Sequence, residues 1–233
     1  MPGSVPIHAQ NSNEILDRHI SAIGGKELIN KVQTIIIKQK FISDNVETIT
    51  LIYSKRPNFY RQEYYFKEAT IIRSYNGKEA WMQKIFPDGS IQMPTILSPE
   101  KTKLLIEDLI YPLGNNLSSS PLNKEPFSYI SRGIVNGRSV YILKSTGSNQ
   151  VTETSFIDDK TYLEIRRIQS NAQNKQEREI NYDDFRTTSG LKIPFHITES
   201  INSKIVMETK ILDFIINNTV PVRWTPIFGQ RSL

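Results

Sequence analysis

Three histidines are the residues with the clearest capacity for acid–base or metal chemistry. His8 lies in the N-terminal tail, and His19 is expected on the polar side of the first helix. His196 belongs to an alternating run in which Ile193 and Phe195 mark the opposite face. No two histidines have the spacing of metal ligands, so the sequence predicts no metal site and no bound cofactor. We expect His196 to be a solvent-side strand residue rather than a catalyst.

Two pairs of adjacent carboxylates, Asp158-Asp159 and Asp183-Asp184, are the next candidates for acid–base or cation chemistry. The first pair separates two extended runs, where aspartate is favoured because it hydrogen-bonds the nearby backbone. The second lies in a strand, where successive side chains point to opposite faces and do not share a proton. A hydrolase triad of His196, Asp183 and a serine lacks a nucleophile-elbow motif, and the absence of cysteine excludes a thiolate site. The sequence therefore predicts no catalytic residue, and a protein that is not an enzyme.

Aromatic and aliphatic side chains of the predicted strands are better candidates for ligand binding. In the run 59–66, Tyr60, Tyr64 and Phe66 share one face, while Phe59 and Tyr65 fall on the other. Such residues can form an apolar cavity with tyrosine hydroxyls near its mouth, or the ordinary core beneath the helices. Alternation does not tell which face of the sheet is concave. The candidate cavity residues are Ile49, Leu51, Tyr53, Tyr60, Tyr64, Phe66, Trp81, Phe156, Leu163 and Ile165.

The elements that position these side chains are predicted to be mainly strands. Helices are expected over 13–23, 26–32 and 99–110, and the first ends at Gly24-Gly25. Apolar residues two apart, separated by turns such as Asn76-Gly77, predict strands over 34–43, 47–55, 59–66, 69–75, 80–85, 129–135, 138–145, 151–157 and 204–216, with three extended runs within 156–200. So many strands favour a mainly β (α+β) fold: a large curved antiparallel sheet that forms an incomplete (half) barrel, with two or three helices packed on its concave face.

The bulk properties are those of one solvated domain. The chain has 233 residues, no cysteine, a net charge of +5 and a pI near 9.2. Its lysines and arginines are spread along the sequence, whereas nucleic-acid binding usually needs a concentrated basic stripe. We expect no nucleic-acid partner. Residues 1–10 read as the remnant of a secretory signal peptide or an added tail, which leaves 11–233 as a single domain.

Several motifs, in order along almost the whole chain, resemble those of one family. They are EILDRHISAIGGKELINKV (14–32), YNGKEAW (75–81), GIVNGRSVYILK (133–144), FIDDKTYLEIRR (156–167) and YDDFRTTSGLKIPFHI (182–197). The chain resembles outer-membrane lipoprotein-sorting-like proteins of the LolA/LolB (periplasmic lipoprotein carrier) superfamily. The resemblance implies a signal-bearing protein of the Gram-negative periplasm, secreted across the inner membrane, with a LolA-like half-barrel and helices that form a lid over an apolar cavity.

Three functions are open at this stage. The first is a non-enzymatic carrier that holds a lipid or an acylated lipoprotein in the cavity, with possible transient contact with envelope membrane proteins. The second is a cofactor-free enzyme, because the fold is similar to that of VioE of violacein biosynthesis. The third is a structural envelope-interaction module whose cavity is filled by side chains. A carrier predicts an apolar hollow, an enzyme predicts converging polar groups, and a structural module predicts a filled interior.

Overall fold

The computed structural model describes residues 12–44, 46–108, 127–146, 151–171 and 176–227. The tail 1–11, in which His8 lies, is outside the described residues, as are residues 109 and 110 of the predicted third helix.

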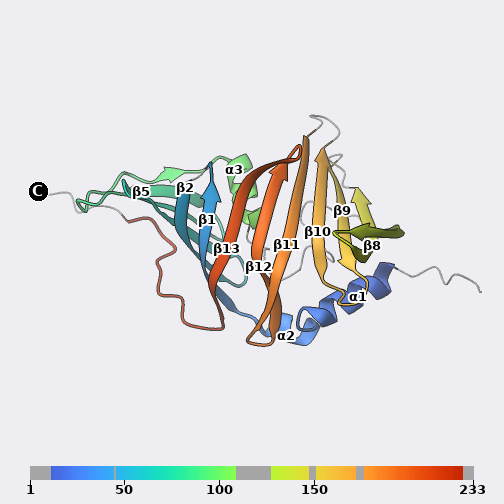
Figure 1. Ribbon diagram of the computed structural model, residues 1–233. Helices are drawn as coiled ribbons and strands as arrows, with labels where there is room; N and C mark the ends of the chain where they lie inside the picture. The colour runs from blue at the N-terminus through green and yellow to red at the C-terminus, as the bar shows by residue number, and fades with distance from the viewer. Residues whose placement is uncertain (1–11, 45, 109–126, 147–150, 172–175, 228–233) are drawn as a thin grey trace, which may run out of the picture.

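One antiparallel sheet of 13 strands forms the body of the described protein (Figure 1). Its strands lie in the order β6-β5-β4-β3-β2-β1-β13-β12-β11-β10-β9-β8-β7, so the first and last strands of the chain meet in the middle. The two edge strands, β6 and β7, are not paired with each other among the described strands, and the curved sheet remains an open half-barrel. The strands are β1 (Thr34–Ser43), β2 (Val46–Lys55), β3 (Phe59–Tyr65), β4 (Thr70–Asn76), β5 (Ala80–Ile85), β6 (Thr95–Ile96), β7 (Ser128–Val135), β8 (Arg138–Thr146), β9 (Val151–Asp158), β10 (Glu164–Asn171), β11 (Gln176–Thr188), β12 (Leu191–Ile201) and β13 (Lys204–Ile216).

Three short helices accompany the described sheet: α1 (Ser12–Ala22), α2 (Lys26–Lys31) and α3 (Pro99–Asp108). Helices α1 and α2 lie at one end of the sheet, and α3 lies behind the strands in Figure 1. Gly24 and Gly25 separate α1 from α2 with positive φ angles of 130° and 83°, which favour glycine. The hydroxyl of Ser98 accepts a 3.4 Å hydrogen bond from the Lys101 amide at the start of α3. No described helix is long and apolar enough to cross a membrane.

Cross-strand register divides the strand residues between two faces, because directly paired residues point to the same side. Ile37 of β1 pairs with Ile52 of β2 and with Phe214 of β13, and all three pack in one cluster with Ile29 of α2. Ile52 also packs in the cluster that contains Leu105 of α3. We call the face that carries the three helices the inner face, and the opposite one the outer face.

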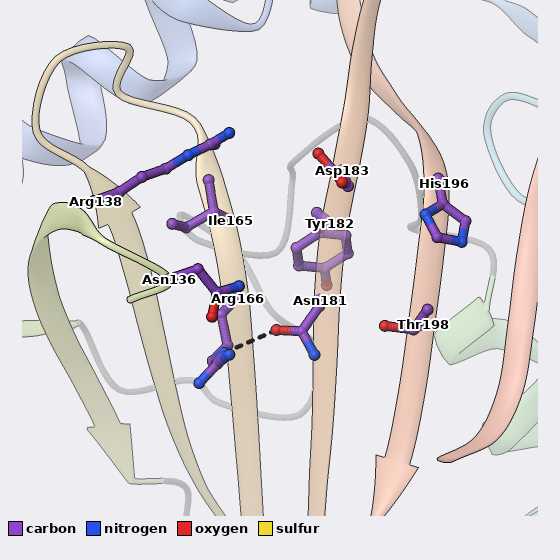
Figure 2. Close-up of a pocket in the computed structure, with 9 residues that line it drawn as sticks. All are labelled: Asn136, Arg138, Ile165, Arg166, Asn181, Tyr182, Asp183, His196 and Thr198. Atoms are coloured by element: carbon purple, nitrogen blue, oxygen red, sulfur yellow. Dashed lines mark hydrogen bonds between the residues drawn. The ribbon is translucent and has the colours of Figure 1, made fainter. Parts of the chain in front are cut away.

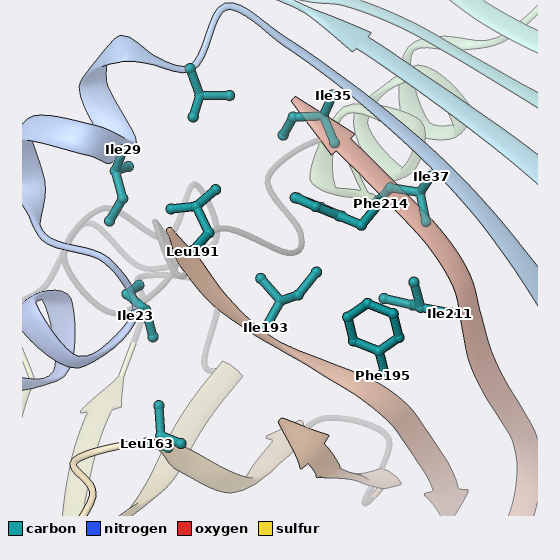
Figure 3. Packing of buried hydrophobic residues seen from close by; sticks show 11 residues of the cluster. Ile23, Ile29, Ile35, Ile37, Leu163, Leu191, Ile193, Phe195, Ile211 and Phe214 are labelled. Atoms are coloured by element: carbon teal, nitrogen blue, oxygen red, sulfur yellow. The ribbon is translucent and has the colours of Figure 1, made fainter. Parts of the chain in front are cut away.

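The largest described core cluster joins α1 and α2 to the middle of the inner face (Figure 3). Leu191 is fully buried in it and Ile193 is 1% exposed. Burial of each such side chain stabilises the fold by about 1.5–3 kcal/mol. The buried members are Ile23, Ile29, Val32, Ile35, Ile37, Leu163, Leu191, Ile193, Phe195, Ile211 and Phe214.

We call residues 217–227 the C-terminal strap; its residues 223, 224 and 227 contact the outer face of β3 and β5. Trp81 Nε1 donates to the carbonyl of Trp224 at 3.2 Å, and the ring of Phe59 packs 5.4 Å from the Trp224 ring. The side-chain amide of Gln83 bonds both main-chain groups of Ile227: Oε1 accepts from its N–H at 3.0 Å and Nε2 donates to its carbonyl at 2.6 Å. Gln83 thus binds the strap much as a neighbouring strand would.

The mainly antiparallel half-barrel with helices on one face confirms the fold class expected from sequence. The predicted strand limits differ from the observed ones by one or two residues at most, and β6 is an additional two-residue strand. Asn136 and Gly137 connect β7 to β8 with positive φ angles of 49° and 75°, as a tight hairpin turn at an Asn-Gly dipeptide requires.

Candidate functional site

The ten predicted cavity residues do not share one wall, because the register divides them between the two faces. Four have contacts on the inner side. Tyr60 packs with Ala80 and with Leu105 of α3, and Tyr64 follows on the same face of β3. Phe66 stacks on Tyr64, and Leu163 packs in the core cluster of Figure 3.

Four other predicted cavity residues lie on the outer face. Leu51 and Tyr53 pair with Glu63 and Arg61 of β3, and Ile49 shares their side of β2. Trp81, which is only 1% exposed, contacts the C-terminal strap rather than the helices. These side chains therefore lie on the opposite face of the sheet from the helices, and Trp81 packs under the strap.

The last two predicted residues, Phe156 and Ile165, pack beside a separate pocket. Ile165 is buried with Val135 and Val140, and Phe156 packs against this cluster. A register shift between Glu164 and Arg166 interrupts the alternation of β10 at Ile165. Regular alternation along β10 does not predict this placement.

Aromatic side chains form a partly exposed group on the inner face, which we call the aromatic rim: Phe41, Tyr64 and Phe66. The rings of Phe41 and Tyr64 meet edge to face at 6.5 Å, and those of Tyr64 and Phe66 stack at 6.2 Å. The guanidinium of Arg73 lies 5.4 Å from the centre of the Tyr64 ring. Because Phe41 is near the end of β1 and α2 directly precedes that strand, the rim is at the end of the sheet away from α2.

Buried polar atoms without hydrogen-bond partners lie next to the aromatic rim. Thr50 is fully buried and Gln62 is 7% exposed, and within the described structure Thr50 Oγ1 and Gln62 Oε1 make no hydrogen bond. Thr50 pairs with Tyr64 and Gln62 pairs with Ile52, so both lie on the inner face. Leaving such groups unpaired costs about 1–3 kcal/mol each. A polar atom of a ligand would relieve this cost.

A buried ion pair within β10 lies beside the first helix. Arg167 donates to both oxygens of Glu164, at 2.9 and 2.6 Å, and the two residues are 5% and 8% exposed. Burial opposes the charge on Arg167, but the negative charge of Glu164 raises the pKa of the guanidinium above its ordinary value. His19 of α1 lies beside this pair.

The expectation that His19 lies on the polar side of α1 is wrong. His19 is 3% exposed, and its Nδ1 is 2.8 Å from the carbonyl oxygen of Tyr162. A carbonyl only accepts, so Nδ1 carries the proton. Burial lowers the pKa of His19, and the negative charge of Glu164 offsets part of that effect. Helix periodicity places Ile15, Ile23 and His19 on one side, and the helix buries the polar member with the apolar ones.

A pocket of about 420 Å³ opens between the β7–β8 turn and strands β10–β12 (Figure 2). Asn136 and Arg138 form one wall, and His196 and Thr198 of β12 form the other. The positive φ of Asn136 turns the hairpin at this wall.

Strands β10 and β11 contribute the residues between these two walls, including Arg166, Asn181 and Asp183. Arg166 Nε donates to Asn181 Oδ1 at 2.8 Å and lies 3.5 Å from Glu179. The Asn181 amide also donates to Glu179 at 2.8 Å, so these three side chains form a network.

The two pairs of adjacent aspartates are placed as the sequence predicts, one in a turn and one in a strand. Asp158 Oδ1 accepts from the main-chain N–H groups of Lys160 and Thr161, as expected for an aspartate in a turn. Burial alone would raise the pKa of Asp158, but hydrogen bonds from Thr161 and Lys160 lower it. Asp183 and Asp184 do not share a proton: Asp183 lines the pocket, whereas Asp184 pairs with Arg186 at 2.6 Å.

His196 lies on the outer face, with its Nε2 2.9 Å from Glu208 Oε1. Hydrogen bonds from Lys210 and His196 lower the pKa of Glu208. His196 is thus hydrogen-bonded to Glu208 of β13, although Asp183 of β11 is its direct cross-strand partner on the other side.

The polar pocket and the buried ion pairs are functional candidates that the sequence prediction missed. Arg61 and Glu63 form a second buried pair on the outer face, at 2.6 Å, and Tyr65 donates a hydrogen bond to Glu63. Opposite charges two apart in a strand share a face, which is the one signal that points to this pair. No sequence pattern points to the pocket, because its lining residues come from the β7–β8 hairpin and from strands β10, β11 and β12.

No protein-family model matches the sequence, and no curated protein matches it. Solved structures match through their fold. A domain described as an outer-membrane lipoprotein-sorting protein, from Vibrio parahaemolyticus, is 9% identical, with a TM-score of 0.58 over 90% of this chain and 95% of that one. A DUF1329 family protein from Desulfovibrio piger is 10% identical, with a TM-score of 0.59 over 90% and 95%. A LolA superfamily protein from Nitrosomonas europaea is 13% identical, with a TM-score of 0.58 over 91% and 96%. The chain therefore has a LolA-like fold.

Proposed function

We propose that this protein is a periplasmic carrier that holds an acyl chain of a lipid or lipoprotein against the inner face of its half-barrel. The LolA-like fold supports this proposal, because one structural neighbour is described as an outer-membrane lipoprotein-sorting protein. At such low identity the likeness concerns the fold alone, so the function is argued from the inner face of this chain.

The aromatic rim is the observation that carries the proposal. Phe66 is 39% exposed, and Phe41 and Tyr64 are half-buried beside it. Aromatic rings accept methylene chains along their faces, and a tyrosine hydroxyl can remain in water. The rim therefore offers an entry point for an acyl chain at the end of the inner face away from α2.

The unpaired atoms next to the rim suit the polar end of an acyl group. The Thr50 hydroxyl can donate to an ester or amide carbonyl, and Gln62 Oε1 can accept from an amide N–H or a hydroxyl. An N-acyl or O-acyl linkage supplies such groups. We place the acyl linkage at Thr50 and Gln62 and the hydrocarbon chain further along the inner face.

Helix α3 acts as the movable cover in this proposal. Its buried Leu105 packs on Tyr60 and Ala80, which an acyl chain would contact in its place. Burial contributes about 0.8 kcal/mol per methylene, so roughly eight methylenes contribute about 6 kcal/mol. That affinity allows release to a membrane or another protein, as a carrier requires.

Location and partners follow from this role. We assign the protein to the periplasm, with an acylated lipoprotein or a lipid as cargo and transient contacts with envelope membrane proteins. Non-enzymatic binding is part of this proposal, in keeping with the neighbour described as a lipoprotein-sorting protein.

Lipid mass spectrometry on protein purified from bacteria without detergent tests the proposal. We expect stoichiometric acyl species in the wild-type extract and their loss in Tyr64→Lys. Leu51→Lys is the matched control, because Leu51 is also half-buried but lies on the outer face, opposite Glu63. Circular dichroism checks that both variants fold.

If the wild-type extract contains no acyl species, even after the protein has been incubated with envelope lipids, the carrier proposal is wrong. A structural module or an enzyme is then favoured. Equal lipid retention by the two folded variants would show that the acyl chain does not use the inner face.

A further inference from the structure

The outer pocket of Figure 2 lies on the other side of the sheet from the proposed acyl site. Asn181 pairs with Thr198, and Asp183 pairs with His196, so these four side chains share the outer face of β11 and β12. The volume of about 420 Å³ is within the range of small-molecule sites. Whatever the pocket binds is therefore independent of the acyl proposal.

Two guanidinium groups line the pocket at opposite ends: that of Arg138 is level with Asp183, and that of Arg166 lies beside Asn181 (Figure 2). Arg138 comes from the start of β8, and Arg166 comes from β10. Arg166 is held through its Nε by Asn181 and Glu179. Arg138 is exposed and interacts electrostatically with Asp158, whose Oδ1 already accepts from the turn that follows β9.

A carboxylate lies at the same end of the pocket as Arg138. Within the described part of the chain, Asp183 forms no hydrogen bond or ion pair through its side chain, and neither Arg138 nor Arg166 reaches it as a salt-bridge partner. The adjacent Asp184, by contrast, is paired with Arg186 at 2.6 Å.

We propose that this pocket binds a small zwitterion, with its phosphate or carboxylate at Arg138 and its primary ammonium at Asp183, since these two side chains lie at the same end of the pocket (Figure 2). A guanidinium binds an oxyanion through two parallel hydrogen bonds, and a carboxylate accepts from an ammonium. A ligand with both charges satisfies both side chains, whereas a simple anion or amine satisfies one. The side chains of Asn136 and Thr198 add hydrogen-bonding groups for the rest of the ligand.

Titration of 15N-labelled protein with O-phosphoethanolamine, inorganic phosphate and ethanolamine tests this inference. We expect O-phosphoethanolamine to shift the amide signals of Asn136, Asn181 and Asp183 and to bind at least about tenfold more tightly than either half-ligand. Asp183→Asn should remove this advantage over phosphate, and Arg138→Gln should weaken phosphate and O-phosphoethanolamine alike.

Asp184→Asn and Arg186→Gln are the matched controls, because that exposed pair lies next to Asp183 in sequence but does not line the pocket. Both should bind O-phosphoethanolamine like the wild type. Absence of pocket shifts at millimolar ligand, or an Asp183→Asn variant that keeps the advantage, would overturn the inference.

Vesicles distinguish the two sources of this chemistry. Binding to phosphatidylethanolamine vesicles, competed by O-phosphoethanolamine and absent with phosphatidylcholine vesicles, assigns the ligand to a lipid headgroup. Binding of the soluble compound alone assigns it to a free zwitterion. Failure of both, with lipid retention on the inner face intact, would reject the pocket and leave the carrier proposal standing.

Discussion

His19 of α1 and Tyr162 of the turn after β9 are joined by a hydrogen bond of 2.8 Å from the imidazole Nδ1 to the main-chain carbonyl. The bond ties the N-terminal helix to a turn 143 residues later in the chain. Arg18 reinforces the link, because its guanidinium donates to the Tyr162 hydroxyl at 2.8 Å. The attachment of α1 thus includes a buried imidazole whose charged form is disfavoured by burial.

Acidification should therefore weaken the protein through His19. Burial lowers the pKa of His19 below its ordinary value of 6.5; Glu164 on the sheet opposes this shift and Arg167 adds to it. Above pH 6.5 the imidazole is neutral in both states, and its contribution to stability is complete. As the pH falls below 6.5, the unfolded chain takes up a proton that the folded protein resists. The free energy of unfolding should then fall by at most about 1.4 kcal/mol per pH unit from this group.

Urea unfolding of the wild type and His19→Asn between pH 7.5 and 5 measures this effect. The asparagine amide can still donate to the Tyr162 carbonyl but does not titrate in this range. The difference in unfolding free energy between the two proteins should shrink as the pH falls. A difference that stays constant from pH 7.5 to 5 would show that His19 does not titrate in this way.

Removing one partner of the ion pair between Arg167 and Glu164 should destabilise the protein. Replacing both residues with apolar side chains should cost much less stability. Glu164→Gln leaves a buried, uncompensated guanidinium, and we expect a loss of about 3–5 kcal/mol in the free energy of unfolding. The double variant Glu164→Leu with Arg167→Met should recover most of that loss, because two apolar side chains need no partner. Denaturant unfolding measures both.

Asp184→Asn, which breaks an exposed ion pair with Arg186, serves as the comparison and should leave the denaturation midpoint nearly unchanged. If the double variant is as unstable as Glu164→Gln, the loss arises from packing and not from the unpaired charge.

A side chain at Gly24 should loosen the junction between α1 and the sheet. Gly24 has a φ of 130°, and a Cβ there would lie 2.9 Å from Leu191 and 3.0 Å from the Gly190 carbonyl oxygen. We expect Gly24→Ala to lower the free energy of unfolding by about 2–3 kcal/mol. Gly89→Ala is the control: its φ is 83° but no atom lies within 4 Å, so only the backbone cost of about 1 kcal/mol applies. Thermal unfolding that ranks the two variants equally would exclude the close contact as the cause.

The strand positions can be predicted from this sequence because turn residues and two-residue periodicity agree along most of the chain. The assignment of faces cannot, because both sides of the sheet are covered. The strap buries Trp81 on the outer face as deeply as α3 buries Tyr60 on the inner one, so apolar alternation marks both alike. Local breaks in strand alternation also prevent the faces from being assigned from sequence. Asp184 has a positive φ of 49°, and Phe185 after it packs against the core while Asp183 lines the pocket.

Two buried glutamines on opposite faces should respond in opposite ways to the same substitution. Gln83 is 2% exposed and makes hydrogen bonds of 3.0 and 2.6 Å to the main chain of Ile227, so Gln83→Leu removes the anchor of the C-terminal strap. We expect a loss of about 1–3 kcal/mol in the free energy of unfolding, and faster hydrogen exchange at the Ile227 amide. Gln62 is 7% exposed and its Oε1 has no partner in the described structure, so Gln62→Leu should be neutral or stabilising.

Urea unfolding and hydrogen exchange by mass spectrometry compare the two variants directly. The Gln62→Leu protein should also retain less acyl ligand despite its unchanged stability, because Gln62 lies on the proposed binding face and Gln83 does not. A Gln62→Leu variant that is destabilised as much as Gln83→Leu would mean that Gln62 Oε1 is satisfied in solution, for example by ordered water. The same result would remove Gln62 from the proposed acyl site, since a hydrated amide would not need the polar end of a ligand.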